Sequence, residues 1–416
     1  MAVKQMQYII IGASAAGMAA AEAIRRLDSE GSVTVLSDEQ DMPYFRPMLP
    51  FIVSGKKKFP EMMLIGQGPY RGANIDVRIN SRVEAVNTAD QKVSIKSGEE
   101  LPYDKLLIAT GSVPNIPSDI AGVEAEGVFV LRTIADACAM AHRAETARHA
   151  VMLGGGLLNL KAAFALLERG MDVTLIVKSP EVLSKLMEPD DTVLIRNALN
   201  KAGLKLVTGS SVTRILSDSS GVIGVLLDSG REIPCQMVCI GKGIRANVEF
   251  LDKSGILVNQ GVVVDKFTRS NIQNVFAAGD VAVTLDPIAG ERIVTGLWTN
   301  AAEMGSCAGR NMAGQPGIYS GTFGILNAAQ VADEPFVSMG IVHTKGTAYE
   351  IHITATPETY RKLVFTPDGT RLVGALFIGD ISKAGLYRYI IREMMPIKDI
   401  KSEIVNHRLH YGHFLR

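Results

Sequence analysis

The stretch Tyr8-Ile-Ile-Ile-Gly-Ala-Ser-Ala-Ala-Gly17 decides the fold of this chain of 416 residues. An apolar run of strand type leads into a glycine-rich turn, and the small residues that follow predict a helix near Ala15–Leu27. The free backbone N–H groups at the start of such a helix bind a pyrophosphate, and a β-carbon at the turn would keep that phosphate away. The stretch therefore predicts a Rossmann unit that holds a dinucleotide.

A second turn of the same kind lies further along the chain. It reads Gly154-Gly-Gly-Leu-Leu-Asn159, follows the apolar run Ala150-Val-Met-Leu153, and precedes a helix that we expect near Leu157–Arg169. A single glycine motif is weak evidence, but two motifs with a strand before and a helix after are strong. We therefore expect the chain to bind two dinucleotides.

Two carboxylates follow the second strand of the first unit, Val33–Leu36. Asp38 and Glu39 lie about 20 residues after the last glycine of the turn, where a carboxylate accepts hydrogen bonds from an adenosine ribose. Glu39 is the preferred residue, and Asp38 is the alternative.

The charged residues balance, because the 43 Lys and Arg residues match 43 Asp and Glu residues. Without a net basic field the chain has no general attraction for nucleic acid or for an anionic membrane, so the composition excludes both as partners. The nearly uncharged stretch Tyr8–Ile24 is shorter than the roughly 20 apolar residues that span a bilayer, and its glycines fit a phosphate turn better than a secretory signal. We expect a cytoplasmic protein.

The four cysteines, Cys138, Cys235, Cys239 and Cys307, are dispersed, which argues against a disulfide framework and fits a reducing compartment. Cys235 and Cys239 lie in an apolar segment at a spacing that matches no common zinc or iron–sulfur site, so we predict buried structural thiols. No metal site is predicted. The segment His407–His413 is interpreted as a surface or interface tail.

The pattern of elements predicts an α/β fold with two Rossmann-like domains and a C-terminal α+β domain. The predicted limits are 1–115 with 245–316 for the first dinucleotide domain, 116–244 for the second, and 317–416 for the last. The segment Ser112–Pro117 is expected to be a loop that crosses between domains. In the last domain, strands are expected at Ala348–Ala355 and Lys362–Phe365, and helices near Tyr387–Met395 and Ile397–Val405.

Two further motifs make a resemblance specific. With Ala109-Thr-Gly111 and Phe276-Ala-Ala-Gly-Asp280 following in order, the chain resembles the FAD-dependent pyridine nucleotide–disulfide oxidoreductase superfamily. Pro43-Tyr-Phe-Arg-Pro47, Leu297-Trp-Thr-Asn-Ala301 and the segment 373–380 resemble the branch that contains the rubredoxin, ferredoxin and nitrite reductase flavoproteins. The resemblance implies that the first turn holds FAD, that the second holds NAD(P)H, and that Asp280 binds the ribityl chain.

Under this resemblance a set of residues is predicted to bind the two cofactors, and two are predicted to be catalytic. The catalytic residues are Arg46, whose charge would offset that of reduced flavin, and Lys161, which would lie near the nicotinamide. Thr299, at the start of a helix, would stabilise charge on the flavin. The cofactor-binding residues are Gly12, Ser14, Ala15, Ala16, Gly17, Asp38, Glu39, Arg46, Pro47, Val83, Ala109, Thr110, Gly111, Arg132, Gly154, Gly156, Asn159, Lys178, Gly241, Gly279, Asp280 and Thr299.

The chain departs from the superfamily in three places. The segment Asp41–Ser54 has no cysteine, which argues against reduction of a disulfide through an enzyme thiol. Asn159 replaces the third glycine of the second turn and puts tight nucleotide binding in doubt. The strand end Ile176-Val-Lys-Ser179 has no carboxylate, so NADPH stays open, although the resemblance favours NADH.

These features predict an enzyme that transfers a hydride between nicotinamide and FAD. Its flavin would then exchange single electrons with a ferredoxin, a rubredoxin or an iron–sulfur subunit. The resemblance includes nicotinamide-reducing subunits of larger complexes that oxidise aldehydes, 2-oxoacids or carbon monoxide. An NADH oxidase that uses oxygen and a flavin-bearing interaction protein are the alternatives, and the sequence leaves open whether the chain forms an oligomer or a hetero-complex.

Overall fold

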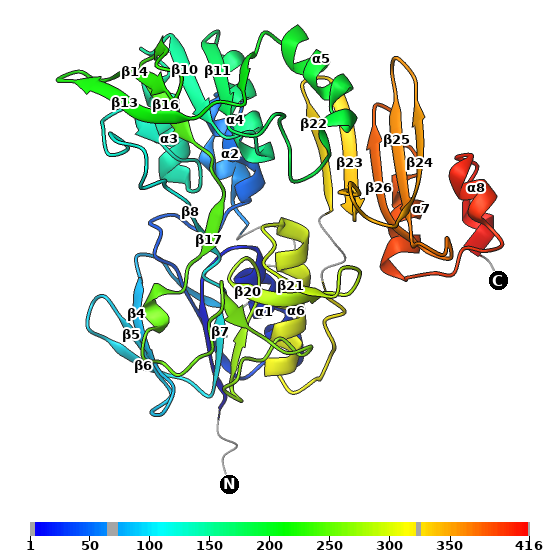
Figure 1. Cartoon of the computed structure of the whole chain (residues 1–416). Helices are drawn as coiled ribbons and strands as arrows, with labels where there is room; N and C mark the ends of the chain where they lie inside the picture. The colour runs from blue at the N-terminus through cyan, green and yellow to red at the C-terminus, as the bar shows by residue number, and fades with distance from the viewer. Residues whose placement is uncertain (1–4, 65–73, 322–325, 415–416) are drawn as a thin grey trace.

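The computed structural model describes residues 5–64, 74–321 and 326–414. Figure 1 shows three bodies, which are a lower lobe that carries the N-terminus, an upper lobe, and a separate sheet at the side that leads to the C-terminus. Each body is built around one five-stranded sheet. The α/β class predicted from the sequence is confirmed.

The lower lobe contains a parallel sheet in the order β19-β7-β1-β2-β3. Its strands are β1 (Gln7–Ile11), β2 (Ser32–Leu36), β3 (Asp76–Arg78), β7 (Lys105–Ile108) and β19 (Val275–Ala277). Helix α1 (Ala15–Leu27) packs against α6 (Trp298–Met312), where a β-carbon on Gly305 would lie 2.1 Å from the Ala16 carbonyl oxygen. Strands from both ends of the predicted discontinuous domain therefore share one sheet.

The upper lobe repeats this plan with a parallel sheet in the order β12-β11-β10-β16-β9. Its strands are β9 (Val128–Phe129), β10 (His149–Leu153), β11 (Asp172–Val177), β12 (Lys205–Thr208) and β16 (Met237–Ile240). Its helices are α3 (Ile134–Arg143), α4 (Leu157–Leu167) and α5 (Val193–Lys201).

Two strands cross together between these lobes (Figure 1). Strand β8 (Ser112–Pro114) pairs antiparallel with β17 (Ile244–Ala246), and the Asn115 N–H continues the pairing to the Gly243 carbonyl at 2.9 Å. The prediction of a loop over Ser112–Pro117 is therefore wrong for its first half. Backbone groups of the outgoing and returning chain satisfy one another here, and this long-range pairing overrides the local signal of the prolines.

Three small antiparallel or mixed sheets complete the two lobes. They are formed by β4 (Val83–Asn87), β5 (Lys92–Ile95) and β6 (Glu100–Pro102); by β13 (Val212–Asp218), β14 (Gly221–Leu227) and β15 (Glu232–Pro234); and by β18 (Val262–Val263), β20 (Ala282–Asp286) and β21 (Glu291–Ile293).

The third body is an antiparallel sheet in the order β22-β23-β26-β25-β24. The strands are β22 (Asn327–Val331), β23 (Glu334–Gly340), β24 (Glu350–Ala355), β25 (Tyr360–Phe365) and β26 (Leu372–Ile378), followed by α7 (Ala384–Arg392) and α8 (Lys401–Val405). The antiparallel sheet and both helices are as predicted, with helix limits shifted by a few residues. The domain limits themselves stay a prediction.

One segment of the N-terminal sequence packs on the upper lobe. The short helices η1 (Arg46–Met48) and α2 (Leu49–Val53) follow the first Rossmann strands in sequence, yet Ile52 and Val53 share a core with Leu160 of α4. Figure 1 shows α2 beside α4. This segment therefore ties the two lobes together, which the sequence did not indicate.

The thiols of the upper lobe are buried as predicted. Cys235 and Cys239 are at most 1% exposed, and burial raises the pKa of each thiol to about 12. Among the described residues, no helix has both the length and the apolar character needed to cross a membrane.

A buried charge cluster joins the upper lobe to the third body. Lys362 of β25 is 2% exposed and forms ion pairs with Glu188 and Asp191, which lie in the upper lobe. Burial opposes ionisation of Glu188, but hydrogen bonds from Lys362 and from the backbone N–H groups of Lys345 and Thr344 outweigh it and lower its pKa to about 2. The Tyr360 hydroxyl donates to Asp191. The cluster therefore holds the third body to the upper lobe.

We predict that Lys362→Met lowers the free energy of unfolding by about 3–5 kcal/mol, because it leaves two buried carboxylates without a cation. Urea unfolding of the full chain measures this. The loss should be larger at pH 8 than at pH 5, since protonation relieves the unpaired carboxylates as the pH falls. Lys345→Ala, which removes the exposed ion pair to Asp190, is the control and should change stability by less than about 1 kcal/mol. An equal effect of the two substitutions would contradict the prediction.

Candidate functional site

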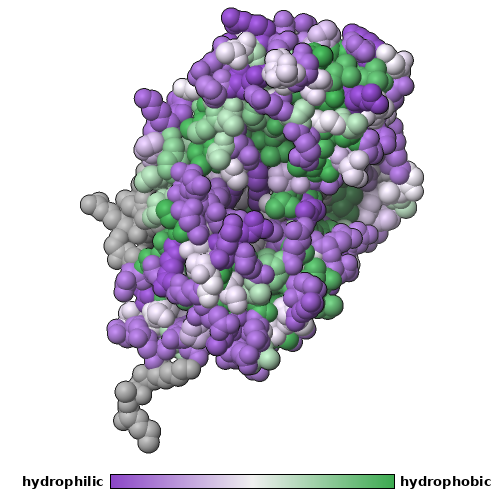
Figure 2. All heavy atoms as spheres, turned by 90° about the vertical axis from the view of Figure 1, so that its left-hand side faces the viewer, coloured by the Kyte–Doolittle hydropathy of each residue, from purple (hydrophilic) through white to green (hydrophobic). Residues whose placement is uncertain are grey.

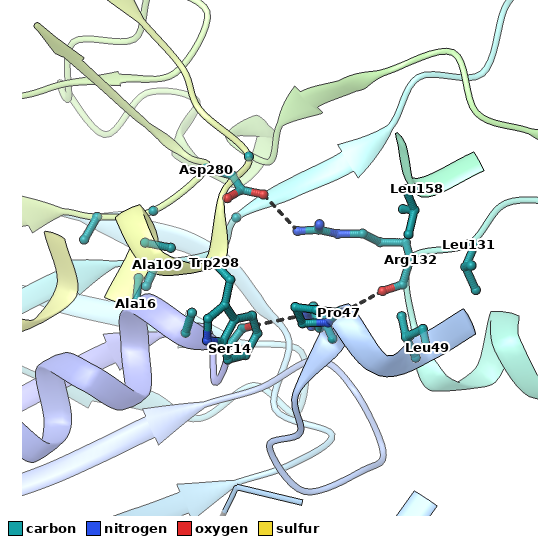
Figure 3. A pocket seen from close by; sticks show the side chains of 17 residues that line it. Ser14, Ala16, Pro47, Leu49, Ala109, Leu131, Arg132, Leu158, Asp280 and Trp298 are labelled. Atoms are coloured by element: carbon teal, nitrogen blue, oxygen red, sulfur yellow. Dashed lines mark hydrogen bonds and ion pairs between the residues drawn. The ribbon is translucent and has the colours of Figure 1, made fainter. Parts of the chain in front are cut away.

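A continuous cleft runs along the first glycine turn. Two adjoining pockets form it, and both are lined by Ser14, Arg46, Ala109, Gly111 and Arg132. One end of the cleft is polar and contains Asp38 and Glu39. The other end is mostly apolar, and Figure 3 shows the side chains that line it, among them Pro47, Leu49, Leu131 and Trp298. An elongated site that changes from polar to apolar suits FAD, with its ribose at one end and its rings at the other.

The glycines of this turn are required by close backbone contacts. Gly12 adopts φ +113°, and a β-carbon on it would lie 2.1 Å from the Ala109 carbonyl oxygen. A β-carbon on Gly17 would lie 1.8 Å from the Gly12 carbonyl oxygen. The turn therefore brings the N-terminus of α1 to the cleft with its N–H groups free, which is the cradle that a pyrophosphate needs.

Arg46 is the centre of the polar contacts in the cleft. Its Nε donates to the Ser14 Oγ at 3.1 Å, its Nη1 donates to the Arg132 carbonyl at 2.8 Å, and its Nη2 is paired with Glu39. Burial alone would lower the pKa of Arg46, but Tyr44 and Glu39 outweigh it and raise that pKa. Arg46 is thus a fixed cation beside the phosphate turn. Its catalytic role stays a prediction, and its contacts favour a role in holding the cofactor.

Tyr44, which the sequence analysis missed, orients Glu39. Its hydroxyl donates to Glu39 at 2.7 Å and accepts from the Ile134 backbone N–H at 3.0 Å and from Arg46 at 3.1 Å, so its full hydrogen-bonding capacity is used. Both carboxylate oxygens of Glu39 are therefore engaged, whereas Asp38 is exposed at the same end of the cleft. Which of the two binds the ribose stays a prediction.

Asp280 lies at the other end of the cleft. Its carboxylate accepts from the buried Ser112 Oγ at 2.8 Å and faces Arg132 Nη2 at 3.4 Å, and Figure 3 shows the Arg132 side chain pointing toward it. Burial, and then the charge of Arg46, lower the pKa of Arg132. The two half-buried arginines therefore each have one carboxylate partner, Glu39 for Arg46 and Asp280 for Arg132.

The apolar end contains two features from distant parts of the chain. Helix α6 begins at Trp298, next to Thr299, where the helix start was predicted. The Trp298 ring contacts the Phe45 ring edge-on, with 4.7 Å between the two ring centroids. Leu158 of α4 reaches the cleft from the upper lobe (Figure 3). Thr299 is exposed and does not line this pocket. Figure 2 shows a recess between the lobes with hydrophobic residues inside it.

The second glycine turn has a pocket of its own at the carboxyl end of β11. The residues that line it include Gly154, Gly155, Lys178, Ser179, Ser210 and Lys242. Gly154 adopts φ +103°, and a β-carbon on it would lie 2.4 Å from the Gly241 carbonyl oxygen. Gly156 has open space where a β-carbon would project, so a ligand has access to this side of the turn.

Asn159 replaces the close contact of the missing glycine with a hydrogen bond. Its buried Nδ2 donates to the Gly154 carbonyl at 2.7 Å, which is the group that corresponds to the Gly12 carbonyl in the first turn. Gly241 makes room for this side chain, because a β-carbon there would lie 2.5 Å from Asn159 Cγ. Asn159 and Gly241 thus support the turn from behind and do not line the pocket.

Lys161 lies one helical turn after Leu158 on α4 and is half-buried. Burial lowers the pKa of its ammonium group. In the described parts of the chain it has no hydrogen bond or ion pair, and it lines neither pocket of the cleft. Its catalytic role stays a prediction.

The structure brings most of the predicted residues together. Those that line the first cleft are Gly12, Ser14, Ala15, Ala16, Asp38, Glu39, Arg46, Pro47, Val83, Ala109, Thr110, Gly111, Arg132, Gly279 and Asp280, and Gly154 and Lys178 line the second pocket. Outside both lie Gly17, Gly156, Asn159, Lys161, Gly241 and Thr299. The sequence analysis missed Tyr44, Leu49, Leu131, Leu158 and Lys242. Of these, Tyr44 lies within the segment Pro43–Pro47 and Leu158 within the second glycine motif, so both carried a signal.

Known proteins share this architecture. The sequence model of the family described as pyridine nucleotide-disulphide oxidoreductase matches residues 6–305. The chain is 28% identical over 415 residues to the NADH-dependent phenylglyoxylate dehydrogenase subunit epsilon of Aromatoleum evansii, which covers 99% of this chain and 97% of the relative. It is 30% identical over 281 residues to the rubredoxin-NAD(+) reductase of Pseudomonas putida, which covers 67% of this chain and 72% of the relative.

A solved structure agrees with this result. The NAD-dependent persulfide reductase from A. fulgidus superposes with a TM-score of 0.89 at 27% sequence identity, covering 95% of this chain and 78% of that one. The family match spans most of the chain and contains both glycine turns, Asp280 and Arg46. The chain therefore belongs to the pyridine nucleotide-disulphide oxidoreductase family, and its cofactors are FAD and NAD(P).

Proposed function

We propose that this FAD-dependent oxidoreductase exchanges electrons between NAD(P)H and an iron–sulfur or rubredoxin-type protein in the cytoplasm. One observation carries the proposal. The apolar end of the cleft is lined by Ser14 and Asp280 of the lower lobe and by Leu158, which follows the second glycine turn directly. A nicotinamide held at that turn would therefore reach the end of the cleft that suits the flavin rings.

The residues that line the cleft fit FAD, and each would have its own role in binding it. Bound FAD supplies the redox chemistry, since it exchanges two electrons with a nicotinamide and single electrons with a metal centre. The free N–H groups at the start of α1 and the cation of Arg46 would hold the pyrophosphate. Asp280, fixed by Ser112 and Arg132, would accept hydrogen bonds from the ribityl hydroxyls. Leu49, Leu131 and Trp298 would exclude water around the rings.

The absence of a cysteine beside the cleft supports a protein partner over a disulfide substrate. The exposed Cys138 and the buried Cys235, Cys239 and Cys307 do not line the cleft. Electrons would then leave the flavin without an enzyme thiol.

Two relatives favour a protein acceptor. One is a subunit of an NADH-dependent phenylglyoxylate dehydrogenase and matches this chain over nearly the full length of both, and another is a rubredoxin reductase. We therefore favour a nicotinamide-linked subunit of a larger complex. The alternative is an NADH oxidase, in which oxygen takes the electrons.

We predict that NADH or NADPH bleaches the visible absorbance of the FAD-loaded chain under anaerobic conditions, because the cleft lets a nicotinamide reach the flavin. Stopped-flow spectroscopy measures the rate. The reduced chain should then pass electrons to a ferredoxin or rubredoxin much faster than to oxygen. Failure of both nucleotides to bleach the flavin contradicts the proposal, and faster transfer to oxygen favours the oxidase.

We predict that Arg46→Gln weakens FAD binding at least about tenfold, because it removes a charge-assisted contact beside the phosphate turn and leaves Glu39 unpaired. The ratio of flavin to protein after purification, and titration of the apoprotein with FAD, measure this. Arg78→Gln, which replaces a half-exposed arginine on β3 that pairs with Asp76, is the control and should bind FAD as the original chain does.

The double substitution Arg46→Gln with Glu39→Gln separates cofactor binding from folding. It removes the unpaired carboxylate, so the fold should recover, while FAD should bind more weakly than to Glu39→Gln alone, which carries the loss of the ribose contact. Full recovery of FAD affinity in the double variant would show that Arg46 acts on the fold alone.

A further inference from the structure

We infer that this chain selects NADP(H) over NAD(H), because Lys178 and Lys242 form a binding site for the 2′-phosphate of adenosine. The inference rests on the proposed function, since it concerns the nucleotide that the second glycine turn would hold. Lys178 follows the last residue of β11, and Lys242 follows Gly241 after β16. Both residues line one pocket, and they follow the two strands that flank β10 in the sheet.

The lining of this pocket contains cations and hydroxyl groups but no carboxylate. Besides the two lysines, the polar side chains are those of Ser179, Ser210 and Ser211. An enzyme that prefers the 2′-hydroxyl places a carboxylate at the end of this strand, where it accepts from the ribose and repels a phosphate. Lys178 and Ser179 stand at that strand end instead.

The nearby carboxylates lie outside the pocket. Glu181 is buried and pairs with Arg196 through Oε1, while its Oε2 has no hydrogen-bond partner in the described part of the chain. Asp228 accepts from the Ser210 Oγ at 2.8 Å and from the Ser211 N–H at 3.0 Å. Neither carboxylate lines the pocket. The pocket lining therefore has no carboxylate to accept a hydrogen bond from a free 2′-hydroxyl or to repel a 2′-phosphate.

The two lysines have no partner in the described parts of the chain. Lys178 is exposed and Lys242 is half-buried, and neither forms a hydrogen bond or an ion pair there. By contrast, Lys205 at the opposite end of the same sheet is paired with Asp172 at 2.8 Å. Two uncompensated cations beside a glycine turn are suited to a phosphate monoester, which carries about −1.5 to −2 charges at neutral pH.

Binding of small probes to the FAD-loaded chain tests the inference without any turnover. Isothermal calorimetry with adenosine 2′,5′-bisphosphate and with adenosine 5′-monophosphate compares two ligands that differ only in the 2′-phosphate. We expect the bisphosphate to bind at least about tenfold more tightly, which is about 1.4 kcal/mol. Equal binding of the two probes, or tighter binding of the monophosphate, would overturn the inference.

Substitutions assign the effect to the two lysines. Lys178→Ala and Lys242→Ala should each weaken the bisphosphate about tenfold and change the monophosphate by less than about twofold. Lys205→Ala removes a lysine from the same sheet away from the pocket and should change neither. A loss in both probes, or none in the bisphosphate, would contradict the assigned roles.

Flavin reduction separates the inference from the proposed function. Half-saturation at a lower concentration of NADPH than of NADH supports both, and the reverse order overturns the inference while the proposed function stands. If the bisphosphate binds through the lysines but neither nucleotide reduces the flavin, the selectivity stands and the proposed function fails.

Discussion

The cleft depends on one requirement, which is that two parallel sheets direct their glycine turns toward the same space. Arg46 meets this requirement directly, because its side chain joins the two lobes by hydrogen bonds. Its guanidinium binds Ser14 at the first turn and the carbonyl of Arg132, which precedes α3 of the upper lobe. Because the side chain is half-buried and four of its five N–H donors are occupied, these hydrogen bonds fix the relative position of the two segments. Helix α2 continues the same link with Ile52 and Val53 in the core of the upper lobe.

The parts that the sequence predicted are those with local causes. Helix α1 has the predicted limits, because an apolar strand, a glycine turn and a helix are specified within about 20 residues. The pairing of β8 with β17, the position of α2 and the burial of Lys362 depend on partners more than 100 residues away in sequence. No periodicity contains that information, and the position of Leu158 beside the lower lobe was missed for the same reason.

The charges of the cleft explain how its two arginines are tolerated in a half-buried position. Each guanidinium has one carboxylate partner, and each carboxylate has a neutral hydroxyl donor as well, Tyr44 for Glu39 and Ser112 for Asp280. A buried ion pair is tolerated only where its remaining hydrogen-bonding groups are satisfied. Four of the five Arg46 N–H donors have partners within the protein, which leaves one donor that a phosphate of the cofactor would accept from.

The two glycine turns show that the third glycine of the motif serves a contact with the first glycine, and that another residue can make this contact. In both turns the carbonyl of the first glycine must be covered by the helix that follows. In the first turn Gly17 approaches the Gly12 carbonyl directly, whereas in the second the Asn159 amide donates a hydrogen bond to the Gly154 carbonyl. The extra volume of Asn159 is accommodated by the missing β-carbon of Gly241. The replacement of the third glycine by Asn159, which in the sequence indicated a weakened motif, therefore preserves the turn. The residues of the pocket beside the turn then determine which nucleotide binds.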